Sequence, residues 1–396
     1  MNLIDFIRYL LIVTMFQSNI CNIHSINIEN KNKKSEINNE DIIAGANQIS
    51  KYIDYINESN IGIVANHTSV IFKKDNSSTH LVDSLLSLNL KISKIFTPEH
   101  GYKGENYNGE NVSDKVDQKT GLEIISLHGK DREYGKISDN DLIDINMMIF
   151  DIQDVGTRFY THISTLHYVM EACARNNIPL LVLDRPNPNG SYIDGPVLEN
   201  ENKSFVGMHP VPIVYGMTIG EYALMINGEG WLGGKLKCKL KVIKLLNYKH
   251  DYNYSLLIKP SPNLPNDRSI FLYPSLCLFE GTNISVGRGT TNQFQVFGSP
   301  YLDQKIYSFT FIPEPNQSSK YPPHNNKKCY GLDLRDHLLE RKLNLSYIIN
   351  AYKNTANKSE FFNDYFIKLS GTKDLKNQII NNISEKIIRK SWKDKI

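Results

Sequence analysis

Apolar runs alternate with helix-length mixed segments over the first half of the chain. Strand-like runs begin at residues 61, 91, 123, 147 and 179, and helical spacing of apolar residues marks 41–58, 80–90, 139–146 and 162–176. Short continuous apolar strands joined by helices are typical of a parallel sheet whose two faces are both covered by helices. The pattern therefore predicts an α/β fold built on a doubly wound parallel sheet.

The alternation loosens after Gly190. Residues 217–233 predict a helix, with Thr218 and Glu221 at the spacing of a capping box. The pair Gly233-Gly234 interrupts the pattern, and residues 237–245 then alternate basic and apolar side chains as a strand with one wet face does. Strand-like pieces follow in 305–335, and helices in 338–355 and 373–392. We place a domain boundary at Gly233-Gly234, between a Rossmann-like sheet domain at 40–233 and a smaller C-terminal α/β domain at 234–396.

The N-terminal residues carry the pattern of an export signal. Within residues 1–23, an apolar run at 9–16 is too short to span a bilayer but resembles the hydrophobic part of a signal peptide. Residues 24–39 are polar and rich in Lys and Asn, which predicts a flexible linker. We expect an exported protein of the periplasm or cell envelope, without a membrane span in its mature chain.

Composition narrows the function classes. Hydrophobic residues make up 40% and charged residues 22% of the chain, ordinary values for a soluble globular protein. A formal net charge of +3 gives no reason to expect a nucleic-acid partner. Five scattered cysteines without a CxxC pair indicate buried free thiols, as at Cys173 and Cys277, in place of a zinc site or disulfide framework. No nucleotide-binding glycine motif occurs, so no cofactor is predicted.

Polar residues without an obvious structural need follow four of the predicted strands. Right-handed crossovers place the carboxyl ends of parallel strands at one edge of the sheet, where ligands of open α/β folds bind. These loops should therefore converge on a single site. Their candidate residues are Asn66, His67, Glu99, His100, Asp151, Asp154, Arg158, Tyr160 and Arg185.

Glu99 is the candidate proton donor among these residues. It leaves an apolar strand between Pro98 and His100, so partial burial could raise the pKa of its carboxyl group toward the working pH. The alternative is that Glu99 caps a helix or pairs with an arginine such as Arg158. Asp151 and Asp154 indicate an acid/base pair or metal ligands, although aspartates at strand ends also commonly bind backbone amides.

The basic candidates have two interpretations as well. Arg158 and Arg185 could clamp a substrate carboxylate with paired hydrogen bonds, or could hold a carboxylate of the protein in place. His67, His100 and His162 could supply metal ligands, but they lack HxH or HxxxH spacing, so we predict no metal.

The second domain contributes two loops, 280–283 and 287–291, in which glycines alternate with charged and hydroxyl residues. Such loops suit a close approach to a polar ligand, whereas the alternative is a wide turn stabilised by threonine hydroxyls. Because Glu280 directly follows an apolar run, we expect it to face the first domain. The candidates here are Glu280, Asn283 and Arg288.

Several long motifs resemble the NamZ family of peptidoglycan exo-β-N-acetylmuramidases. The likeness runs from about residue 61 to residue 392. Three positions depart from the family pattern: His67 where Gln is expected, His162 where Tyr is usual, and Tyr215 where His is expected. The principal motifs are FTPEHGYKGE (96–105), DIQDVGTRFYTHISTL (151–166), LDRPNPNG (183–190), PSPNLP (260–265) and LFEGTNISVGRGTTNQFQVFGSPYLD (278–303).

The resemblance implies a hydrolase for cell-wall turnover and recycling. Such an enzyme removes a terminal β-linked N-acetylmuramic acid (MurNAc) from the non-reducing end of peptidoglycan fragments. The resemblance also implies a Rossmann-like domain, a smaller α/β domain and an active site in the cleft between them, with Glu99 as a catalytic residue.

Glycoside hydrolysis typically uses two carboxyl groups, and the second would be Glu280, Asp154 or Asp151. The lactyl carboxylate of MurNAc would have Arg158, Arg185 or Arg288 as a partner. The alternative function is a non-catalytic muropeptide-binding protein of the envelope.

Overall fold

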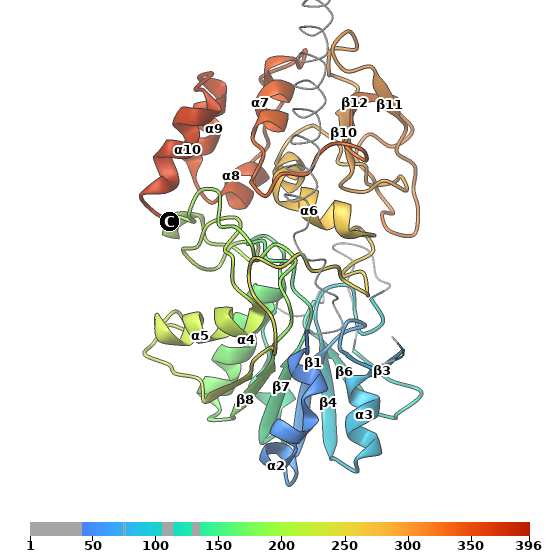
Figure 1. The fold of residues 1–396 in the computed structure, drawn as a ribbon, viewed down its shortest axis with the longest axis vertical. Helices are drawn as coiled ribbons and strands as arrows, with labels where there is room; N and C mark the ends of the chain where they lie inside the picture. Colours follow the sequence, from blue (N-terminus) through green and yellow to red (C-terminus); the bar gives the residue numbers. More distant parts are fainter. Residues whose placement is uncertain (1–41, 74, 76, 105–113, 129–134) are drawn as a thin grey trace, which may run out of the picture. The chain divides into compact units, whose positions relative to one another are not determined.

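A seven-stranded sheet organises the first two thirds of the chain, in the order β5-β6-β4-β1-β7-β8-β9 (Figure 1). The computed structural model describes residues 42–73, 75, 77–104, 114–128 and 135–396, so the predicted signal segment and linker lie outside the described residues. The strands are β1 (Ile61–Ala65), β4 (Ile92–Thr97), β5 (Lys115–Val116), β6 (Glu123–Ser126), β7 (Met147–Asp151), β8 (Leu180–Leu183) and β9 (Leu240–Ile243).

Strand pairing confirms the predicted fold class. All neighbours in this sheet are parallel except β5, which runs antiparallel to β6. Counted along the chain, the parallel strands lie in the order 3-2-1-4-5-6, which is that of the Rossmann sheet. Antiparallel pairing also joins a small hairpin of β2 (Val70–Phe72) and β3 (Ser78–His80).

Both faces of the sheet are buried, which is why its strands are continuous apolar runs. Ile63 and Ile149 point into a core that also contains residues of α2 (Ile53–Ile56) and α3 (Leu81–Ser87). Their neighbours Val64 and Phe150 point into the opposite core, beneath α4 (His162–Arg175) and α5 (Ile219–Gly228). Alternate residues of one strand thus serve two cores.

The first predicted helix is wrong. Residues 41–58 form two short 3-10 turns, η2 (Gly45–Asn47) and η3 (Ile49–Lys51), and then the single turn α2. Gly45 is the reason, because its backbone N–H donates to the Asp184 carbonyl at 2.8 Å, and a Cβ there would lie 2.5 Å from the backbone nitrogen of Asp184. The chain is anchored to the sheet at this point. The helix predicted at 139–146 is likewise a 3-10 turn, η4 (Asp139–Leu142).

The sheet continues past the boundary that we predicted near Gly233. Strand β9 pairs in parallel with β8, so Leu240–Ile243 belongs to the first sheet. Gly233 and Gly234 both have positive φ and form a turn between α5 and this edge strand. The capping box of Thr218 and Glu221 at the start of α5 is confirmed.

The C-terminal region forms a second α/β unit around its own hydrophobic core. The predicted helix at 373–392 is in fact two helices, α9 and α10, interrupted near Asn382, whose φ is +54°. Helix α6 (Asp267–Leu276), which contains Pro274, was not predicted. The elements are α6 (Asp267–Leu276), η6 (Cys277–Gly281), an antiparallel sheet of β10 (Val296–Ser299), β12 (Cys329–Asp333) and β11 (Phe309–Phe311), and α7 (Ser346–Lys353), α8 (Tyr365–Ser370), α9 (Lys373–Ile380) and α10 (Glu385–Lys393).

Residues that follow β7 join the two regions. Val155, Phe159 and Tyr160 lie in the hydrophobic core of the C-terminal region, although they come directly after a strand of the first sheet. Among the described residues, no helix is both long and apolar enough to cross a membrane. Cys173, Cys238, Cys277 and Cys329 are buried free thiols; this confirms the prediction for Cys173 and Cys277.

Candidate active site

A cleft of about 420 Å³ lies where loops of the first sheet meet the C-terminal region. The turn after β4 and the start of α4 supply one wall, and α6, η6 and α8 supply the other. Ring faces and edges of Phe159, Phe205, Tyr273, Phe294 and Tyr365 provide the apolar part of this lining. The polar part contains Glu99, His100, His128, Thr161, His162, Ser204, Asn263, Glu280, Arg288 and Lys368.

A tight turn holds Glu99 at the edge of the cleft. The Gly101 N–H donates to the Pro98 carbonyl at 3.1 Å, and His100 and Gly101 have φ of +72° and +73°. A non-glycine residue in this region is strained, and such strain is common at functional sites. Phe294, on the opposite wall, is another non-glycine residue with positive φ, at +53°.

Thr161 and His128 contact the two carboxylate oxygens of Glu99. The Thr161 hydroxyl donates to Glu99 Oε2 at 3.3 Å, and His128 Nε2 lies 4.0 Å from Oε1. Burial lowers the pKa of His128 despite the opposing effect of Glu99. His128 is therefore mainly neutral near pH 7.

Glu280 is paired with an arginine that also lines the cleft. Arg288 Nε donates to Glu280 Oε1, and the Cys277 thiol donates to Oε2 at 3.6 Å. Burial alone would lower the pKa of Arg288, but the charge of Glu280 and its hydrogen bond to Arg288 more than offset this, so the pKa is raised. Glu280 and Arg288 therefore form an ion pair inside the cleft.

Some buried polar atoms of the lining have no hydrogen-bond partner within the described residues. They are both ring nitrogens of His162, Ser204 Oγ, Asn263 Oδ1 and Arg288 Nη1. Buried polar groups are nearly always bonded in native proteins. A set of unbonded atoms around one cavity therefore indicates a polar ligand.

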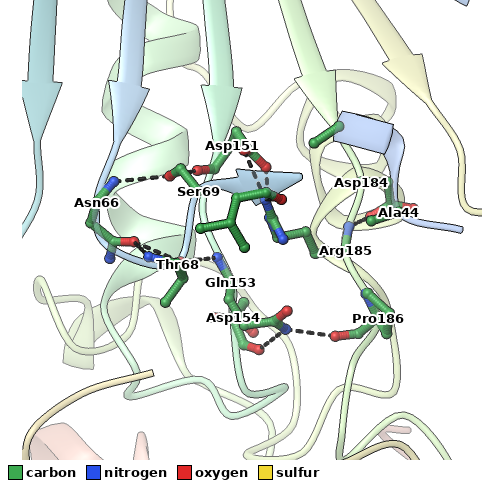
Figure 2. Close-up of polar contacts among 12 residues, drawn as sticks. Ala44, Asn66, Thr68, Ser69, Asp151, Gln153, Asp154, Asp184, Arg185 and Pro186 are labelled. Atoms are coloured by element: carbon green, nitrogen blue, oxygen red, sulfur yellow. Dashed lines mark hydrogen bonds and ion pairs between the residues drawn. The ribbon is translucent and has the colours of Figure 1, made fainter. Parts of the chain in front are cut away.

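A second group of polar residues lies at the ends of β1, β7 and β8 (Figure 2). We call it the strand-end network, and its members are Asn66, Thr68, Ser69, Asp151, Gln153 and Arg185. Arg185 donates to both carboxylate oxygens of Asp151, at 2.6 and 2.8 Å, and to the Val70 carbonyl at 2.9 Å. Asp151 is 0% and Arg185 3% exposed, and neither lines the cleft. The alternative that Arg185 holds a carboxylate of the protein is confirmed.

Asn66 and His67 also have structural partners. Asn66 Oδ1 accepts from the backbone and hydroxyl of Thr68 at 2.8 and 2.6 Å, which closes the loop after β1. His67 Nε2 bonds the Lys259 carbonyl at 2.9 Å, and its ring lies against Gly104, where a Cβ would approach to 2.0 Å. Both side chains therefore contact loops outside the cleft lining.

Arg158 connects the two regions of the chain. It is fully buried and donates to four backbone carbonyls: Pro196 and Val211 at 2.8 and 2.7 Å, and Leu369 and Ser370 at 3.0 and 2.7 Å. The last two belong to α8, which carries Lys368 and Leu369 in the cleft wall. Arg158 is thus neither a substrate clamp nor the partner of Glu99; it positions α8.

Two further candidates, Asp154 and Asn283, also lie outside the cleft lining. Asp154 accepts from the Gly156 N–H at 2.7 Å and from the Tyr215 hydroxyl, and burial raises its pKa to about 7. The backbone of Asn283 bonds Phe361 and His324. Asp154 Oδ1 and Asn283 Oδ1 are buried without a hydrogen-bond partner within the described residues, so the roles predicted for these two side chains stay predictions.

Of the twelve site residues predicted from the sequence, the structure brings five together in the cleft: Glu99, His100, Tyr160, Glu280 and Arg288. The polar lining residues that the predicted twelve did not include are His128, Thr161, His162, Ser204, Ser261, Asn263, Tyr273, Tyr365 and Lys368. Asn263 lies in the PSPNLP motif and could have been found there. Lys368 carries no local signal in the sequence.

The suggested metal set is not assembled around the cleft. His100 and His162 line it, whereas His67 does not. In the described parts of the chain, no group of three His, Cys, Asp or Glu side chains could hold a metal ion.

Two family models cover almost all described residues. The N-terminal model of the exo-β-N-acetylmuramidase NamZ matches residues 61–268, and the C-terminal model matches 271–396. The peptidoglycan β-N-acetylmuramidase NamZ of Bacillus subtilis strain 168 is 37% identical over 352 residues, which are 84% of this chain and 82% of that protein. The division near residue 270 agrees with the start of α6 at Asp267.

Solved structures with the same fold come from Bacteroides fragilis. One DUF1343 family protein aligns with a TM-score of 0.81 and 42% identity, covering 90% of this chain and 95% of that one. A second DUF1343 family protein aligns with a TM-score of 0.73 and 28% identity, covering 89% and 94%.

Proposed function

The chain belongs to the exo-β-N-acetylmuramidase NamZ family, and from this membership and the cleft we propose that it is an exo-acting glycosidase of peptidoglycan. Its substrates are peptidoglycan fragments with a β-linked MurNAc at the non-reducing end, and its product is free MurNAc. The reaction serves turnover and recycling of the cell wall.

One observation carries this proposal: two glutamates from different regions of the chain line the same cleft. Glycosidases need one carboxyl group to protonate the leaving oxygen and a second that is ionised. Glu99 lies at the edge of the cleft beside Thr161 and His128. Glu280 forms an ion pair with Arg288. We assign Glu99 as general acid and Glu280 as the ionised partner.

The surrounding residues suit this division of roles. The Thr161 hydroxyl fixes Glu99 Oε2, which leaves Oε1 on the side of His128. Apolar ring surfaces from Phe205 and Tyr273 suit the faces of sugar rings. The lactyl carboxylate of MurNAc would be held by Arg288 Nη1 or by Lys368, since cations bind carboxylates through charge-assisted hydrogen bonds.

Product analysis of a defined disaccharide tests the activity. We expect incubation with MurNAc-GlcNAc, in which MurNAc is the non-reducing sugar, to release both monosaccharides. The reversed disaccharide, GlcNAc-MurNAc, is the matched control and should remain intact. Failure to release MurNAc from the first substrate, with MurNAc-GlcNAc nevertheless bound, would overturn the proposal and favour a binding protein.

We also propose that the protein acts outside the cytoplasm. The support is the apolar run at residues 9–16, followed by the polar segment at 24–39. N-terminal sequencing of protein from envelope extracts should find a chain that begins beyond the apolar run. An intact Met1 in that fraction would contradict this.

A further inference from the structure

His162 is the most conspicuous polar side chain of the cleft that the two-glutamate mechanism does not use. It is 2% exposed and lines the cavity as the first residue of α4, next to the Thr161 that bonds Glu99. Neither of its ring nitrogens has a hydrogen-bond partner among the described residues. Two buried unbonded nitrogens are costly unless a ligand satisfies them.

The orientation of the imidazole is fixed by packing. The Tyr160 ring meets it edge to face at a centroid distance of 4.7 Å, and the Tyr160 hydroxyl is itself anchored on the Pro260 carbonyl at 3.0 Å. The imidazole is therefore held in place before a ligand arrives, which lowers the entropic cost of binding.

The charge state of His162 determines what it can bind. Burial lowers its pKa to about 3, and the neighbouring His100 and His67 contribute in the same direction. A neutral imidazole offers one donor and one acceptor but no charge. It therefore suits an uncharged group that both gives and accepts a hydrogen bond, and it gives no electrostatic reason to attract a carboxylate.

The cleft lining contains a second uncharged polar atom that is buried and unbonded, in the side chain of Asn263. Asn263 is 3% exposed, and its Nδ2 donates to the Ser318 carbonyl at 3.0 Å, whereas its Oδ1 is unbonded within the described residues. The cleft lining thus offers two kinds of polar contact: uncharged atoms at His162 and Asn263, and the cations Arg288 and Lys368.

We propose that His162 is a substrate-binding residue that holds an uncharged hydroxyl or acetamido group of the terminal sugar. This inference rests on the proposed function, because it takes the ligand to be a MurNAc residue. His162 thereby contributes to sugar recognition next to Glu99, while the lactyl carboxylate is left to the cations.

The test compares steady-state kinetics of wild-type protein and His162→Phe on a chromogenic β-glycoside of MurNAc. Phe keeps the ring that packs on Tyr160 and removes both nitrogens. We expect KM to rise about tenfold, with kcat within about twofold, because loss of a ground-state hydrogen bond weakens substrate and transition state alike. His162→Gln, which keeps a donor and an acceptor, should restore part of the affinity.

Substrate analogues identify the group that His162 holds. The 4-deoxy and 6-deoxy glycosides and the analogue with a hydroxyl in place of the acetamido group are assayed with both proteins. One of them should raise the wild-type KM about tenfold and cause no further rise in His162→Phe, because both changes remove the same hydrogen bond. If every analogue loses affinity equally in both proteins, the proposal is overturned.

Controls separate this inference from stability and from the proposed function. His167→Gln removes another buried histidine of α4, bonded to His209 outside the cleft, and should lower the melting temperature without changing KM. An unchanged KM in His162→Phe, or loss of one limb of its pH–rate profile, would overturn the binding role. If His162→Phe does not fold, wild-type kinetics with the analogues and the Gln variant decide. A wild-type protein without turnover would instead contradict the proposed function.

Discussion

Arg185 in the strand-end network directs its guanidinium hydrogen bonds to Asp151 and Val70, whereas Arg288 in the cleft bonds Glu280 and leaves Nη1 unbonded within the described residues. Both arginines are paired with a carboxylate, and both were candidates to bind substrate. They differ in what remains after the protein's own contacts are made. Only the cleft pair lies on a cavity with further unbonded polar atoms around it.

The comparison explains why a Rossmann strand order here does not imply a nucleotide. Ligands of such sheets usually bind beyond the carboxyl ends of the strands, at the point where strand order reverses, which here lies between β1 and β7. The residues at that point are bonded to one another, as Ser69 is to the Asp151 carbonyl and Arg185 to the Asp151 carboxylate (Figure 2). The cleft lies farther out, against the C-terminal region.

The largest effect should come from breaking the buried pair of the network. Arg185→Met leaves the Asp151 carboxylate buried without its partner, which should cost about 3–5 kcal/mol in the free energy of unfolding. Urea denaturation measures this loss, and kcat/KM of the folded protein should change by less than about threefold. The double variant Asp151→Asn/Arg185→Met should recover part of the stability. A large loss of kcat/KM in folded Arg185→Met would place the network in the active site.

Asp154 should make stability depend on pH. Burial raises its pKa to about 7, so between about pH 4 and pH 7 the folded protein holds a proton that the unfolded chain has released. The folded state therefore loses stability as pH rises through this window, by at most about 4 kcal/mol at 1.36 kcal/mol per pKa unit. Asp154→Asn removes the titration, so its stability relative to wild type should increase with pH. If the free energy of unfolding changes with pH in the same way for both proteins, the raised pKa of Asp154 is contradicted.

Glu99→Gln should reduce kcat by at least about 10²-fold, the low end for removal of a general acid. This corresponds to about 2.7 kcal/mol in the activation free energy. The melting temperature should stay close to that of wild type, since Gln is isosteric and the Thr161 hydroxyl keeps an acceptor. Near-normal turnover of a chromogenic MurNAc glycoside by this variant would remove Glu99 from the mechanism.

The smallest effect is expected for an exposed ion pair, which serves as the control for the buried one. Lys119 bonds Asp83 at 2.6 Å, and the lysine side chain is 71% exposed. Lys119→Met should change the free energy of unfolding by less than about 1 kcal/mol, because solvent screens such pairs. If Lys119→Met lowers the free energy of unfolding as much as Arg185→Met does, burial does not explain why one ion pair stabilises the fold more than the other.

Sequence reasoning predicted the sheet because buried parallel strands are continuous apolar runs, as in β7 and β8. It failed at residues 41–58, where helical spacing was present but Gly45 is held against the backbone of Asp184. It placed the candidate loops at one edge of the sheet, but it could not tell which of their residues line the cleft and which bond other residues of the protein. Which carboxylate an arginine meets depends on tertiary contacts, and Asp151 and Arg185 are 34 residues apart.

The family motifs mark structural and catalytic residues alike. DIQDVGTRFYTHISTL contains Asp151 and Arg158, which have partners inside the protein, together with His162, which has none within the described residues. Only the contacts of each side chain separate the two kinds of residue. Arg158 bonds the end of α8, the helix that carries Lys368 into the cleft wall. No local sequence pattern at either residue indicates this contact.

The most direct test is a crystal structure of the Glu99→Gln variant with MurNAc-GlcNAc bound. We expect the MurNAc ring in the cleft between residue 99 and Glu280, with a neutral group of the sugar on His162. Asp151 and Arg185 should keep their pair and make no contact with the ligand. A disaccharide bound at the strand-end network, with the Asp151–Arg185 pair opened, would contradict the account.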